Sequence, residues 1–141
     1  DDIKDVMLPD ELLQDQGKRV AIPLNTKTIQ AGGSHVFGLG ILNIDPSAYG
    51  TDFSVDIELS KAVDDNEVEY TQSAEVGIIM SYILYDNGPF ILQQNEYETV
   101  PILVDIPNDA RKGTYIFNIR VTSDFTANQY DNTKKFYVTV T

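Results

Sequence analysis

The chain has 141 residues, about the length of one domain. A domain of this size can bury a hydrophobic core without disulfides, and the sequence contains no cysteine. With 22 Asp and Glu against 10 Lys and Arg, its formal net charge is -12. This charge repels phosphate backbones and anionic lipid headgroups, so we expect neither nucleic-acid binding nor adhesion to a membrane surface. No run of about 18 apolar residues occurs, and the chain as given therefore carries no predicted membrane span.

The first 17 residues form an acidic segment with six carboxylates and one lysine, and they show no strand pattern. We interpret residues 1–17 as a linker or a donor strand. Residues 18–141 are predicted to form one β-sandwich domain.

Strand patterns begin at Val20. Residues 20–24 alternate, with Pro23 at an edge position, and the strand continues at 28–30 after a kink at Asn25. Residues 34–43 form the next predicted strand. Its inner face carries His35, Phe37, Leu39 and Ile41.

The middle of the chain combines a regular strand with a continuous apolar run. Residues 53–59 alternate strictly, as expected for a half-exposed strand. Residues 78–85 are apolar apart from Ser81. This run predicts a strand covered on both faces, or covered on one face by a partner chain that contacts Ile79 and Ile83.

Two strands joined by a turn form residues 100–122, which organise the rest of the fold. Period-two alternation runs through both strands, and Pro107 and Gly113 lie in the turn between them. Tyr115 starts the second strand, the position of a corner tyrosine whose hydroxyl bonds the backbone just upstream. A last strand follows at 135–141. The pattern predicts an all-β, antiparallel immunoglobulin-like sandwich of seven to nine strands.

A family pattern is visible once these strands are placed. It consists of I-Q-A-G-G-S at 29–34, the strand ending at Asn43, the strand at 53–59, I-P at 106–107 and D-A-x-x-G-x-Y at 109–115. The pattern resembles immunoglobulin-like domains of archaeal and bacterial secreted and surface proteins. These include accessory domains beside glycoside hydrolases, cell-adhesion-related modules and the soluble domains of archaeal filament-motor stators. The resemblance covers most of residues 28–141 and implies an extracellular, non-catalytic module, without carrying over functional residues. Residues 1–17 have no counterpart in it, and 64–85 are longer than usual.

Catalytic chemistry has little basis in the sequence. His35 is the one histidine, no nucleophile elbow occurs, and no carboxylate pair is marked as buried. We expect no enzyme and no cofactor, with calcium as the one candidate ligand. Asp64, Asp65 and Glu67 concentrate hard oxygen ligands in one loop, although the spacing of a known calcium loop is absent.

The predicted function is that of a structural or interaction subunit of an archaeal cell surface, partnered by its own copies or by other surface proteins. Strand addition would build a filament or pilus, with Ile3, Met7 and Leu8 of one chain filling pockets in the next. Two alternatives stay open. One is an accessory module that binds calcium, or binds carbohydrate on Tyr70, Tyr82, Tyr85, Phe90 and Tyr97. The other is the soluble domain of a membrane-anchored archaellum stator protein.

Overall fold

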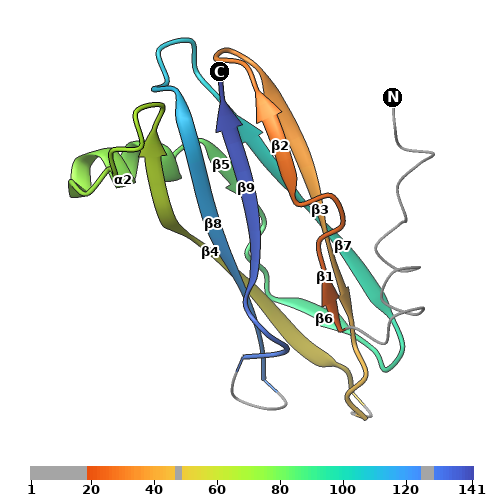
Figure 1. Ribbon diagram of the computed structural model, residues 1–141. Coiled ribbons are helices and arrows are strands. Elements are labelled where there is room, and N and C mark those ends of the chain that lie inside the picture. The colour runs from red at the N-terminus through yellow and green to blue at the C-terminus, as the bar shows by residue number, and fades with distance from the viewer. Residues whose placement is uncertain (1–18, 47–48, 125–128) are drawn as a thin grey trace.

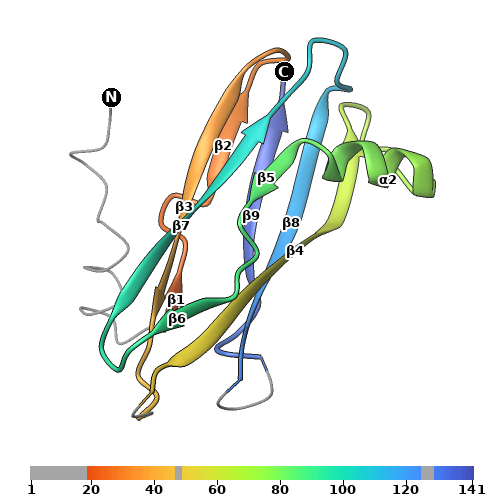
Figure 2. The same ribbon diagram turned by 180° about the vertical axis from the view of Figure 1, so that it is seen from behind.

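The computed structural model describes residues 19–46, 49–124 and 129–141, which form two β-sheets packed face to face (Figures 1 and 2). Their strands are β1 (Val20–Ala21), β2 (Thr26–Ile29), β3 (Ser34–Leu42), β4 (Thr51–Asp64), β5 (Ile83–Tyr85), β6 (Phe90–Leu92), β7 (Tyr97–Asp105), β8 (Gly113–Ser123) and β9 (Lys134–Val140). One sheet has the order β1-β3-β7-β5 and the other the order β2-β9-β8-β4-β6. The predicted all-β sandwich is confirmed, with nine strands in the described residues.

The core lies between the sheets because each long strand turns alternate apolar residues inward. On β8, Tyr115, Phe117, Ile119 and Val121 are all at most 2% exposed. Phe136 of β9 lies between Phe37 of β3 and Phe117 of β8, with ring centroids 4.8 Å and 4.9 Å away. This ring cluster joins the two sheets across the middle of the sandwich.

The predicted kink at Asn25 is the point where the chain changes sheets. β1 pairs antiparallel with β3, whereas β2 pairs parallel with β9. Asn25 holds the crossing, since its side-chain amide donates to the carbonyl of Lys135 at 2.9 Å. Among the described strands this is the one parallel pair, and all other pairs are antiparallel, as predicted.

The prediction of one strand over residues 78–85 was wrong. Residues Ser73–Met80 form helix α2, and only Ile83–Tyr85 form a strand, β5 (Figure 2). A short apolar run cannot be assigned to strand or buried helix by periodicity, and here the tertiary contacts of Ile79 decide for the helix. Within the described part of the chain, no helix is long and apolar enough to cross a membrane.

Candidate functional site

The corner between β7 and β8 is fixed by Tyr115 and Gly113, as the sequence predicted for these positions. The buried Tyr115 hydroxyl donates to the backbone carbonyl of Arg111, four residues upstream. Gly113 has φ +148°, and its α-carbon packs against the backbone of Val63 and Asp64. Pro107 lies in the turn, where its carbonyl accepts the Ala110 N–H at 3.1 Å.

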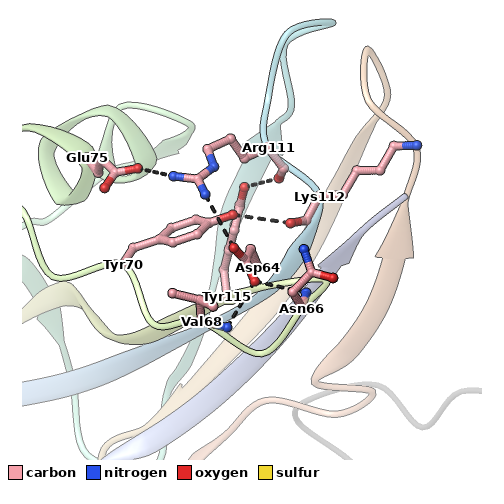
Figure 3. A network of polar contacts seen from close by, with 8 residues as sticks. All are labelled: Asp64, Asn66, Val68, Tyr70, Glu75, Arg111, Lys112 and Tyr115. Carbon is pink, nitrogen blue, oxygen red and sulfur yellow. Dashed lines mark hydrogen bonds and ion pairs between the residues drawn. The ribbon is translucent and has the colours of Figure 1, made fainter.

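Arg111 links the turn before β8 to β4 and α2, whose contacting residues lie 36 to 47 positions earlier in the chain (Figure 3). Its guanidinium forms ion pairs with Glu75 of α2 and, at 3.4 Å, with Asp64 of β4. It also lies over the ring of Tyr70, 4.2 Å from the centroid, a favourable cation–π geometry. The Tyr70 hydroxyl donates to the carbonyl of Lys112 at 3.1 Å, a further contact that holds the turn before β8.

The carboxylate of Asp64 closes the loop that follows β4. Its Oδ1 accepts the backbone N–H groups of Asn66 and Val68, both at 2.9 Å, while Oδ2 faces Arg111. In residues 19–46, 49–124 and 129–141, no three His, Cys, Asp or Glu side chains are grouped to hold a metal ion. The geometry thus gives no support to the calcium site at Asp64, Asp65 and Glu67, which stays a prediction.

A pocket of about 180 Å³ lies between α2 and the turn before β8. Its lining is Tyr70, Glu75, Ile78, Ile79, Tyr82, Asp109, Arg111 and Tyr115. Burial raises the pKa of Tyr82, and the nearby carboxylate of Asp109 raises it further. The Tyr82 hydroxyl therefore stays protonated at neutral pH and is able to donate or accept a hydrogen bond.

The outer surface of the four-stranded sheet is unusually apolar. Leu103 of β7 lies between Leu84 of β5 and Val36 of β3 in register, and Gly38 pairs with Pro101 one row further. We call these five residues the apolar face. Val36 is 54% exposed and Leu84 is 62% exposed. On β3, β5 and β7, the one charged residue of this outward parity is Asp105, at the end of its strand.

The outer surface of the five-stranded sheet is polar by contrast. Asp56 and Glu58 of β4 share it with Arg120 of β8, which forms an ion pair with Glu58. Lys135 of β9 donates to the side chain of Asn118. A polar outer surface is the usual pattern for an antiparallel sheet with one face in water, and the apolar face departs from it.

Two of the residues predicted to contact a partner chain, Ile79 and Ile83, are buried. Ile79 is 3% exposed and Ile83 is 6% exposed, because both pack in the chain's own core. They offer no surface to a partner, and the exposed apolar residue of β5 is Leu84. Ile3, Met7 and Leu8 lie outside the described residues.

The sequence did contain a signal for the apolar face. Leu103 is apolar between two exposed residues of the same parity, Val36 follows the exposed Ser34, and Leu84 is the outward-facing residue of the short strand β5. Arg111 and Asp109 gave no such signal, since an exposed turn commonly carries charged residues.

No family model matches the sequence, and no curated protein matches it. Among solved structures, a family 123 glycoside hydrolase from Clostridium perfringens is similar, with a TM-score of 0.56 and 14% identity. That match covers 96% of this chain but 25% of the hydrolase, so the chain spans about a quarter of that protein. A PapD-like domain of human CEP192 is also similar, with a TM-score of 0.54, 11% identity and coverage of 86% and 83%. At these identities the likeness shows a shared β-sandwich fold alone.

Replacing Tyr115 with phenylalanine should lower the free energy of unfolding by about 0.5–1.5 kcal/mol, the net contribution of one buried hydrogen bond. Burial strongly raises the pKa of Tyr115. The unfolded chain therefore ionises first, and stability that is fully present below about pH 10 is lost as the pH rises further. The variant should lose less stability than the parent between pH 9 and about pH 11.

Urea unfolding of Tyr115→Phe at pH 7 and at alkaline pH measures both effects. Tyr137→Phe is the matched control, because its hydroxyl has no hydrogen-bond partner in the described residues and its loss should fall within about 0.5 kcal/mol. Equal stabilities for the two variants would contradict a structural role for the corner hydroxyl.

Proposed function

We propose that this chain is a non-catalytic structural domain of an archaeal cell surface, and that its copies associate through the apolar face. The extracellular, microbial setting rests on the sequence resemblance to archaeal and bacterial surface proteins, and the archaeal source rests on its archaeal members. The association rests on the apolar face itself, an uncharged and exposed sheet surface on a protein of net charge -12.

Electrostatics favour this face as the contact between copies. Two acidic copies repel each other across most of their surfaces, and desolvated carboxylates add a further cost. The apolar face brings no carboxylate into such a contact, apart from Asp105 at its border. Removing this apolar surface from water favours association, and the gain must exceed the cost of lost translational, rotational and side-chain freedom.

Strand addition is restricted to the edges of the sheets. β9 is paired on both sides, with β8 and with β2, so the five-stranded sheet has no gap for a donated strand. The edge strands are β1 and β5 in one sheet, and β2 and β6 in the other. β5 borders the apolar face, and a neighbouring chain that docks there also reaches an open strand edge.

A closed dimer and an open filament differ in the surfaces that they use. Apolar face against apolar face is a self-complementary contact and closes as a two-fold dimer. A filament needs a second, different surface, and residues 1–17 are predicted to provide it as a donor strand. That segment lies outside the described residues, and its role as a donor stays a prediction.

The experiment is light scattering coupled to size-exclusion chromatography, from low to high micromolar concentration. The parent chain should shift towards dimers or larger species as its concentration rises. Leu84→Asp should weaken this association at least tenfold, because it places a carboxylate within the apolar face. Thr122→Asp is the matched control, since Thr122 is exposed on the outer surface of the other sheet and its change should leave association unaltered.

Each other outcome argues against the proposal. A parent chain that stays monomeric throughout would exclude self-association and favour a different surface protein as the partner. Association that survives Leu84→Asp, with the fold verified by circular dichroism, would exclude the apolar face as the contact.

The carbohydrate alternative has less support from the geometry. Sugar binding commonly needs an exposed aromatic ring, whereas Tyr70 and Tyr82 are 6% and 9% exposed. Arg111 also covers the ring of Tyr70. Of the predicted stacking residues, Tyr97 is the most exposed, at 47%, and it stands at the far end of β7 from this pocket.

A further inference from the structure

The pocket between α2 and the turn before β8 contains two polar groups that the fold leaves unengaged. Tyr82 is 9% exposed and lines the pocket, yet within the described residues its hydroxyl has no hydrogen-bond partner. Asp109 lines the same pocket, and its carboxylate forms no ion pair with any described residue. The Tyr82 hydroxyl therefore opens onto the pocket, where a ligand can take the place of water as its hydrogen-bond partner.

The charges around the pocket favour a cation. Asp64 and Glu75 are both engaged by Arg111, which balances one of these two negative charges and leaves the other. Asp109 adds a further negative charge at the rim, close enough to Tyr82 to affect its hydroxyl. Of the charged residues that line the pocket, Glu75 and Asp109 are acidic and Arg111 is basic, so the lining has an excess of negative charge that attracts a positive group.

The shape and lining restrict the ligand to one slender side chain. At about 180 Å³ the pocket is smaller than the roughly 300–1,000 Å³ that accommodates a drug-sized ligand. Ile78 and Ile79 provide an apolar wall for an aliphatic stem. Arg111 already covers Tyr70, so that ring offers no free face on which a second guanidinium or a sugar ring could stack.

We propose that this pocket binds a lysine side chain presented by another polypeptide. The ammonium group donates to the Asp109 carboxylate and to the Tyr82 hydroxyl oxygen, while the methylene stem packs against Ile78 and Ile79. The pocket includes no residue of the apolar face. The lysine site therefore goes beyond the proposed self-association and does not depend on it.

The test is a titration of the full chain with Nα-acetyl-lysine N-methylamide, followed by NMR of the isoleucine methyl groups and the tyrosine rings. Signals of Ile78, Ile79 and Tyr82 should shift and saturate in the millimolar range. Nα-acetyl-norleucine N-methylamide, which has the same stem without the charge, should bind at least fivefold more weakly. Carrying out the titration in the Leu84→Asp background removes any contribution from association through the apolar face.

Three variants locate the binding. Asp109→Asn and Tyr82→Phe should each weaken binding of the lysine probe at least threefold. Both variants should fold, because Asp109 is exposed and Tyr82→Phe removes a single oxygen atom. Asp56→Asn is the control for lost charge, since Asp56 is exposed on the outer surface of the five-stranded sheet and should leave the titration unchanged.

Three results would overturn the proposal. Equal binding of the norleucine probe would mean an apolar contact without charge recognition. Saturable binding of methyl α-glucoside or methyl α-galactoside at the same methyl groups, in preference to lysine, would assign the pocket to sugars. Absence of saturation, or saturation that neither pocket variant changes, would exclude the pocket as a lysine site.

Discussion

Gly113→Ala should destabilise the fold by about 3–5 kcal/mol, one of the largest effects of a single substitution in this chain. A β-carbon at this position would lie 2.0 Å from the carbonyl oxygen of Val63 and 2.7 Å from the α-carbon of Asp64. Both atoms belong to the backbone of β4, which is paired with β8 along its length and cannot move aside without breaking that pairing. The φ of +148° adds further strain for any residue with a side chain.

Urea unfolding, extrapolated to water, measures this loss. Gly77→Ala is the matched control, because no atom lies within 4 Å of the β-carbon it would add and Gly77 is inside helix α2. There the same substitution should stabilise the protein by about 0.4–1 kcal/mol. A Gly113→Ala variant that loses less than about 1 kcal/mol would show that the β4 backbone does not confine this position.

Phe136→Ala should cost about 3–5 kcal/mol for a different reason, the loss of the ring that joins the two sheets. Phe136 is 0% exposed and contacts Phe37 of one sheet and Phe117 of the other. Removing its ring leaves a cavity between long, paired strands that have little freedom to close it. The same variant should also expose the core to dyes that bind apolar surface.

Phe136→Leu distinguishes a cavity from a general intolerance of change at this position. Leucine keeps most of the volume, and its cost should stay below about 1.5–2 kcal/mol. If the alanine and leucine variants unfold at the same urea concentration, ring packing is not what stabilises the contact between the sheets.

The pocket and the apolar face lie near the same edge of the sandwich. α2 and β5 are consecutive in the chain, so the pocket and the apolar face are both positioned by residues 73–85. Pairing of β5 with β7 and packing of Ile79 and Ile83 in the core hold this segment in place. The two binding proposals therefore use neighbouring parts of one well-packed segment, α2 and Tyr82 for the pocket and Leu84 of β5 for the apolar face.

Strict alternation allowed the sequence to predict the long strands. From Tyr115 to Val121 on β8 and from Phe136 to Val140 on β9, every second residue is apolar and buried, and the structure has both strands where the pattern placed them. The corner at Tyr115 was also readable, because a tyrosine just after a glycine turn reaches back only a few residues along its own chain. Such features depend on residues that are close in sequence, and they can therefore be predicted from local sequence patterns.

Where the outcome depended on distant residues, only the tertiary structure decided it. Residues 78–85 have the composition of a strand, yet the space between β4 and the β7–β8 turn accommodates a helix that buries Ile79. Asp64 belongs to an acidic run that suggested a cation site, but Arg111, 47 residues away, supplies its positive partner. The sequence by itself therefore determined the long strands, the corner and the acidic surface. Only the folded structure decided which apolar residues became core and which formed the apolar face. It also decided which carboxylates are paired, because these contacts join segments that only folding brings together.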